Sequence, residues 1–252
     1  MKVKNIKSFI EFYRFLQITT CISQTPRNFK KPISKSFVKK EETAIPKELN
    51  KKPYSEKKNS RLECLDKLKK QIKNINCNLK EIATNLVFSD GNPNANIMLM
   101  GEAPGAKEDL IGKPFVGEAG QLLDKMLGYI QLNRDNFYIS NMVFWRPPGN
   151  RTPNNDEISL CIPLARKHIS IIKPKLLILV GSIAAKNLLK SKDGITKLRG
   201  KEHVYRDDEY NIEIPTRAIF HPAYLLRNPI EKKRTWEDLL EIDNFITKNK
   251  IK

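Results

Sequence analysis

KPKLLILVGSIAAKNLLK, residues 173–190, contains the pattern on which the fold prediction rests. The apolar run Leu176–Val180 has the length and composition of a fully buried strand, and Gly181 then leads into a segment of helical period, Ser182–Leu189. A buried strand followed at once by a helix is typical of a parallel sheet covered by helices. The longest nearly apolar run, 176–185, is about half the length that a bilayer requires, which excludes an integral membrane protein.

Short apolar runs continue to alternate with longer helical segments on both sides of this unit. The other expected strands are 96–100, 137–143 and 217–220. The other expected helices are 62–75, 120–130, 156–172 and 235–248. We therefore predict one α/β domain over residues 61–252, with a parallel sheet between helices.

Residues 1–60 have a different composition. They carry 15 of the 46 basic and 5 of the 28 acidic residues, a net charge of +10. We expect a short amphipathic helix over 4–19 and a poorly ordered basic linker over 22–60, which is rich in Lys, Ser and Pro. The linker is either a solvated connection or an arm that tethers the protein to DNA. The segment has no clean apolar core of a signal peptide.

Charge and cysteine content narrow the function. The net charge of +18 and the isoelectric point of about 9.7 favour a polyanionic partner such as nucleic acid. The four cysteines lack CxxC spacing and are too few for a disulfide framework, which suits a reducing compartment. We expect a soluble, cytoplasmic protein.

In open parallel sheets, ligands bind beyond the C-terminal ends of the strands. The first predicted strand runs into GEAPGAKEDLIGKPFVGEAG, residues 101–120, which matches neither a GK[ST] phosphate loop nor GxGxxG. The second strand ends at Asn141, and the fourth runs into His221. Each residue alone has an ordinary structural explanation. Together, the Phe115 ring, the Asn141 amide and the His221 imidazole could stack a flat ring, bind its edge and stabilise an oxyanion.

Three long blocks carry a resemblance to a known family. They read GEAPGAKEDLIGKPFVGEAGQLLDKML (101–127), YISNMVFWRPPGNRTP (138–153) and FHPAYLLRNP (220–229). In order and spacing they resemble the signature blocks of the family 4 uracil-DNA glycosylases. The resemblance implies a three-layer αβα sandwich with a four-stranded parallel sheet. It also implies an enzyme that flips uracil out of single- or double-stranded DNA and hydrolyses its N-glycosidic bond, leaving an abasic site.

The resemblance assigns roles by position. Phe115 would stack on the extruded base, and Asn141 would bind its Watson–Crick edge. His221 would donate a hydrogen bond to a uracil carbonyl, and Glu102 would orient the attacking water. The further assignments are Glu108 in the rejection of thymine, Asn150 as a polar catalytic-site residue, Leu226 as the wedge that fills the vacated space, and Arg146, Arg151 and Arg227 as DNA contacts.

Typical members of this family hold a [4Fe–4S] cluster on four cysteines, and this sequence departs from that pattern. Cys77 and Cys161 match two of the positions, whereas Asn74 and Trp145 occupy the other two. Two thiolates cannot hold four irons in the usual way, so we expect no metal and no cofactor. The alternative to an active enzyme is a catalytically inactive, glycosylase-like DNA-binding module. In either case we expect a monomer.

Overall fold

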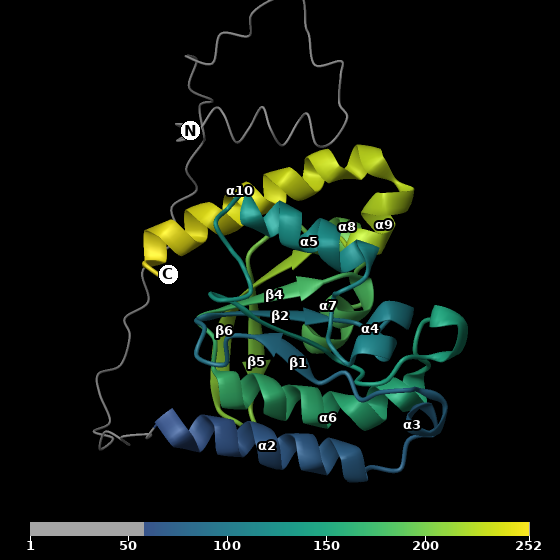
Figure 1. Cartoon of the computed structure of the whole chain (residues 1–252). Helices are drawn as coiled ribbons and strands as arrows, with labels where there is room; N and C mark the ends of the chain where they lie inside the picture. Colours follow the sequence, from purple (N-terminus) through teal and green to yellow (C-terminus); the bar gives the residue numbers. More distant parts are fainter. Residues whose placement is uncertain (1–57, 252) are drawn as a thin grey trace, which may run out of the picture. The chain divides into compact units, whose positions relative to one another are not determined.

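A computed structural model describes residues 58–251, which form a three-layer α/β unit (Figure 1). Its centre is a six-stranded sheet with the strand order β1-β3-β2-β4-β6-β5. The strands are β1 (Ser89–Gly91), β2 (Ile97–Gly101), β3 (Tyr138–Asn141), β4 (Leu176–Val180), β5 (His203–Asp207) and β6 (Ile212–Ile219).

The four predicted strands form the parallel centre of the sheet, in the order β3-β2-β4-β6. A four-stranded sheet is nevertheless too small a prediction, because β1 and β5 add antiparallel edges beside β3 and β6. The sequences of these edge strands, SDG and HVYRD, contain no apolar run that would indicate a strand. β6 also begins well before residue 217, because its first half pairs with β5.

Helices cover both faces of the sheet. α2 (Lys58–Asn74) packs on α6 (Asn155–Ile172) on one face, while α5 (Glu118–Gly128) and α10 (Lys232–Asn249) lie on the other (Figure 1). These four and α7 (Ser182–Leu188) confirm the predicted helices. The remaining helices are too short to show a helical period in the sequence: α3 (Asn78–Ile82), α4 (Ala106–Ile111), α8 (Ile195–Leu198), α9 (Pro222–Arg227), η1 (Pro148–Asn150) and η2 (Pro229–Glu231).

β2 and β4 are buried along their whole length. This is expected for central strands of a parallel sheet that has helices on both faces. Alternate side chains of a strand point to opposite faces, and Met98, Met100, Leu177 and Leu179 join the hydrophobic cluster that contains residues of α2 and α6. The close-packed centre fixes the positions of the strand ends, where the predicted site lies.

The predicted N-terminal extension, with its expected helix over 4–19, lies outside the described residues. α2 begins at Lys58, so the folded part starts slightly before the predicted boundary at residue 61. Among the described helices, none combines the length and the apolar character needed to cross a membrane.

A buried histidine links α6 to the sheet. His168 is fully buried, its Nε2 lies 2.8 Å from the Tyr138 hydroxyl, and its ring stacks on Phe88 with 4.5 Å between the ring centroids. Burial lowers the pKa of His168 from 6.5 to about 3. The imidazole is therefore neutral in the folded protein at physiological pH.

We expect His168 to make the fold sensitive to acid. Below about pH 6.5 the unfolded chain takes up a proton that the folded protein excludes until about pH 3, so stability present at neutral pH is lost across this window. Each pH unit in the window costs about 1.4 kcal/mol. Between about pH 6.5 and 4.5, His168→Gln should therefore lose about 2–3 kcal/mol less unfolding free energy than the wild-type protein. Urea denaturation at several pH values in this range measures the loss. If the unfolding free energy fell equally steeply with pH in the two proteins, the expectation would be contradicted.

Candidate active site

Segments from four parallel strands meet beyond the C-terminal end of the sheet. β2 ends at Gly101 and leads into Glu102, and Gly101 lies directly opposite Asn141, the last residue of β3. Gly181 follows β4, and a Cβ at Gly181 would lie only 3.0 Å from Cβ of His221, which follows β6. The structure thus brings the predicted acid, amide and imidazole to one edge of the sheet.

Asn141 holds an unusual polar atom. The residue is 1% exposed, and its amide oxygen is buried without a hydrogen-bond partner among the described residues. Such an atom costs about 1–3 kcal/mol and most buried polar groups are paired, so this one is suited to accept from a ligand N–H. Gly101 makes the arrangement possible, because a Cβ there would clash with the Asn141 amide oxygen and approach Cζ of Phe115 to 2.5 Å.

Phe115 is buried and lies in the left-handed region with φ 56°, which is uncommon for an aromatic residue. The turn is tight, because a Cβ at Gly120 in α5 would overlap the Phe115 carbonyl. The ring centroid lies 5.9 Å from that of His221, with 33° between the planes. The aromatic ring, the imidazole and the Asn141 amide therefore line the same site.

His221 caps α9 with its side chain. Nδ1 accepts a hydrogen bond from the Ala223 N–H at 3.2 Å. Burial, with the positive charge of Arg227 adding to it, lowers the pKa of His221 to about 4. The ring is therefore neutral at neutral pH, and because Nδ1 accepts, the proton resides on Nε2. His221 thus presents a neutral N–H donor.

The two acidic candidates differ in environment. Burial raises the pKa of the Glu102 carboxyl above its usual value of 4.5. Oε1 of Glu108 accepts hydrogen bonds from the N–H groups of Val116 and Gly117 at 2.8 and 2.7 Å. Glu108 therefore ties α4 to the residues just before α5 and restrains the loop that carries Phe115.

Three further predicted residues lie on the loop that joins β3 to α6. Nε of Arg146 donates to Oδ1 of Asn150 at 2.7 Å, and Asn150 is exposed. Arg151 pairs with both carboxylate oxygens of Glu157, at 2.6 and 2.9 Å. Among the described residues, no hydrogen bond or ion pair joins these three to the strand-end site. The Arg151 guanidinium therefore stabilises its own loop through Glu157.

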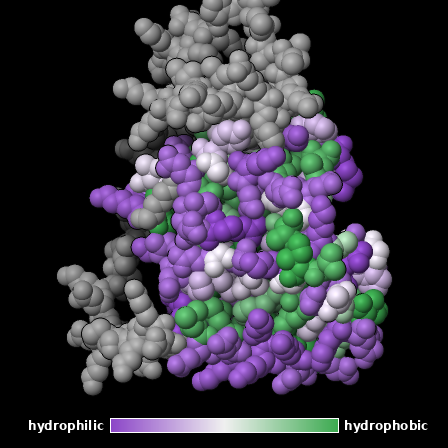
Figure 2. Space-filling model, viewed as in Figure 1, coloured by the Kyte–Doolittle hydropathy of each residue, from purple (hydrophilic) through white to green (hydrophobic). Residues whose placement is uncertain are grey.

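The two neighbouring leucines of α9 differ in exposure. Leu225 is fully buried, whereas Leu226 is 42% exposed and Arg227 is also exposed. Leu225 is therefore a core residue, and the predicted wedge, Leu226, points outward. Exposed apolar side chains interrupt a mainly hydrophilic surface on the face seen in Figure 2.

A family profile described as the uracil DNA glycosylase superfamily matches residues 88–240, more than half of the chain. The chain belongs to this superfamily. Three relatives are each named "Type-4 uracil-DNA glycosylase". The relative from Sulfurisphaera tokodaii is 42% identical over 189 residues, which cover 72% of this chain and 84% of the relative. The relative from Pyrobaculum aerophilum is 37% identical, covering 69% and 91%, and that from Thermotoga maritima is 38% identical, covering 68% and 88%.

The residues of this superfamily member do not fit a four-thiolate cluster. Cys77 and Cys161 are buried, and burial, reinforced by the nearby Cys77, raises the pKa of the Cys161 thiol to about 12. Asn74 is exposed, while Trp145 is buried with its ring edge-on to Phe144. Among the described residues, no three Cys, His, Asp or Glu side chains gather as possible metal ligands.

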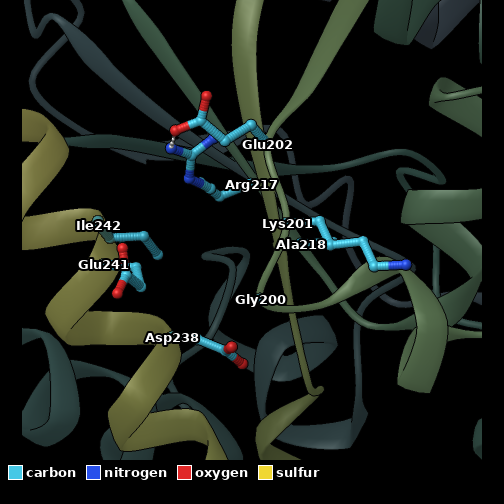
Figure 3. Close-up of a pocket in the computed structure, with 8 residues that line it drawn as sticks. All are labelled: Gly200, Lys201, Glu202, Arg217, Ala218, Asp238, Glu241 and Ile242. Atoms are coloured by element: carbon cyan, nitrogen blue, oxygen red, sulfur yellow. Dashed lines mark hydrogen bonds and ion pairs between the residues drawn. The ribbon is translucent and has the colours of Figure 1, made fainter. Parts of the chain in front are cut away.

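A small cavity elsewhere in this glycosylase-like fold is unsuited to a nucleobase. It lies beside β6 and α10 and has a volume of about 40 Å³ (Figure 3). Ordinary ligand sites measure roughly 300–1,000 Å³. Nη2 of Arg217 donates to Glu202 at 2.6 Å across its rim. Its lining residues are Gly200, Lys201, Glu202, Arg217, Ala218, Asp238, Glu241 and Ile242.

Sequence reasoning missed residues that hold the site in place. Asp109 is buried and accepts from the N–H groups of Thr84 and Asn85, which anchors α4. Glu157 completes a capping box with Asn154 at the start of α6, and the N-x-x-E spacing was a readable signal for it. The bonds of Asp109 carried no such signal, since they depend on a turn distant in sequence.

We expect Asn141→Leu to remove the site's acceptor without destabilising the fold. Leu has the same branched skeleton of side-chain heavy atoms and needs no hydrogen bond, so the unfolding free energy should stay equal or rise by about 1–3 kcal/mol. Ser140→Ala is the matched control, because the Ser140 hydroxyl donates to the Phe88 carbonyl at 2.6 Å and its loss should destabilise by about 1 kcal/mol. Urea denaturation measures both. A loss in Asn141→Leu as large as that in the control would show that the amide oxygen is satisfied.

Proposed function

We propose that this protein is a uracil-DNA glycosylase, which flips uracil out of DNA and hydrolyses its N-glycosidic bond to leave an abasic site. The observation that carries the proposal is the buried amide oxygen of Asn141, which lies next to the Phe115 ring and has no partner in the part of the chain that the structure describes. A base stacked on that ring would bring its Watson–Crick edge to the amide. The names of the relatives, "Type-4 uracil-DNA glycosylase", agree with this chemistry.

Uracil fits the Asn141 amide because its edge carries a ring N–H beside a carbonyl. The amide oxygen accepts from the N–H, and the amide nitrogen donates to the carbonyl. Cytosine has an unprotonated ring nitrogen and an amino group at these places, which would leave acceptor facing acceptor and donor facing donor. Each buried polar group left unpaired costs about 1–3 kcal/mol, so the amide discriminates between the two bases.

His221 is proposed to stabilise the leaving group. When the bond between the sugar C1′ and uracil N1 breaks, the electron pair moves onto the base and its carbonyl oxygens gain negative charge. The neutral Nε2–H of His221 would donate to the carbonyl beside N1, without the cost of burying a cation. A donor of this kind is typically worth about 3–4 kcal/mol in the transition state.

Glu102 is proposed to orient the water that attacks C1′ and to accept its proton. The carboxylate also stabilises the positive charge that develops on the sugar. Its pKa, raised by burial, suits proton acceptance better than that of a solvated carboxylate. Because two N–H groups fix Oε1 of Glu108, this second carboxylate cannot move aside for a methyl group, and we propose that it helps exclude thymine.

We propose that DNA is the partner of this protein and that it lies over the strand-end site. We also propose that the protein is a monomer and acts in the cytoplasm. Leu226 would fill the space left by the flipped nucleotide, and Arg227 would contact phosphate. Arg146 would contact the backbone, oriented by Asn150. Arg151 remains a candidate contact only through the exposed part of its side chain, because Glu157 holds its guanidinium.

The deciding experiment incubates the protein with a labelled oligonucleotide that carries one uracil, single- and double-stranded, and then cleaves abasic sites with alkali. We expect scission at uracil and none at thymine or cytosine. Asn141→Ala and His221→Ala should each lower the rate by about 10²–10³-fold. Arg206→Ala, which breaks only an exposed ion pair between β5 and β6, should retain activity. No scission by folded protein would favour an inactive DNA-binding module.

We also propose that the enzyme works without a [4Fe–4S] cluster, with Trp145 packing where the family's cluster would lie. Protein purified from iron-supplemented cultures should contain far less than stoichiometric iron and lack visible cluster absorption. Trp145→Ala should lower the unfolding free energy by about 3–5 kcal/mol. Stoichiometric iron with full activity would contradict the proposal.

A further inference from the structure

The Phe115 ring occupies its place only because the backbone beneath it adopts an unfavourable conformation. A positive φ brings the side chain of a residue other than glycine close to its own backbone, and such residues persist only where the surroundings hold them. The next two N–H groups along the chain are held by Glu108. The backbone carbonyl groups of the turn need a separate hydrogen-bond donor.

Arg134 holds that side. Its Nη2 donates to the Phe115 carbonyl at 2.8 Å, and its Nη1 donates to the Pro114 carbonyl at 3.2 Å. The two bonds grip consecutive carbonyls of the strained turn from one rigid, planar group. Glu108 and Arg134 therefore clamp the turn from its two ends.

Arg134 is itself fixed in every direction. Nε and Nη2 donate to the two oxygens of Asp124 in α5, both at 3.1 Å, and Nη1 donates to Asp90 of β1 at 3.2 Å. A guanidinium has five N–H donors, and these five bonds use all of them. Its carbon also lies 5.6 Å from the centre of the Phe137 ring. The guanidinium thus joins β1, α5 and the residue just before β3 to the turn of Phe115.

We propose that Arg134 is a positioning residue for the base-stacking ring of Phe115. It lies between the first two signature blocks, in the turn that joins α5 to β3. It acts through the turn and not on the base, and its effect on excision rests on the proposed glycosylase function. Without Arg134 the turn would relax to a negative φ, and the ring would leave the space beside Gly101.

The first test needs no activity. A crystal structure of Arg134→Gln should show Phe115 with a negative φ and its ring displaced from Asn141. Asp124→Asn, which weakens the orientation of Arg134 but leaves it in place, gives a second variant if Arg134→Gln does not fold. Phe115 unchanged at a positive φ in the variant would overturn the proposal.

The second test is a double-mutant cycle on the single-turnover rate of uracil excision at saturating enzyme. Arg134→Gln should lower this rate about 10- to 100-fold, because an ångström of misplacement has an effect of that size. In a Phe115→Ala background the same change should lower the rate by less than about twofold, because the ring on which Arg134 acts is absent. A merely structural arginine would give the same factor in both backgrounds, and that result would overturn the proposal.

Arg166→Gln is the matched control. Arg166 is similarly exposed, at 27% against 24% for Arg134, and it also forms a bidentate pair with one aspartate and a contact with a second carboxylate. It lies on α6, on the opposite face of the sheet from α5. Arg166→Gln should lower the unfolding free energy by about as much as Arg134→Gln does, and it should keep the wild-type rate of uracil excision. If wild-type protein excises no uracil, the proposed function fails, while the structure of Arg134→Gln still decides the placement of Phe115.

Discussion

Within residues 58–251, the buried amide oxygen of Asn141 has no hydrogen-bond partner, and the neighbouring residues keep it so. A buried acceptor without a partner would ordinarily change its rotamer, bond to a neighbouring donor or become exposed to water. Here it sits at the end of a central strand, opposite a glycine whose missing side chain leaves no group to pair with it. The fully buried strands β2 and β4 make the position rigid. The stability of the sheet thus offsets a local cost that prepares the protein for a ligand.

Loops around this rigid centre are held by charged side chains that bond to backbone groups and to one another. The loop between β3 and α6 has its Trp145 buried, and Arg151 holds the pKa of Glu157 below its usual range while Glu157 also caps α6. A partly exposed ion pair contributes little alone, but this one shares its carboxylate with the helix cap. These shared contacts fix the end of this loop to the start of α6.

The sequence was sufficient for the elements whose pattern is periodic or fully apolar. Leu176–Val180 and the long helices could be predicted for this reason, and the rule for parallel strands placed Asn141 and His221 together at one edge. β1 and β5 could not be predicted, because their pairing depends on neighbours and not on their own composition. Likewise, nothing local distinguishes an arginine that contacts DNA from one that pairs with a glutamate six residues later, as Arg151 does.

The tautomer of the His221 imidazole depends on a very short helix. Nδ1 caps α9, and only while that cap is made is the proton confined to Nε2. α9 has only six residues, and the fully buried side chain of Leu225 anchors it in the core. The donor proposed on His221 therefore depends on the packing of this one side chain as well as on the cap.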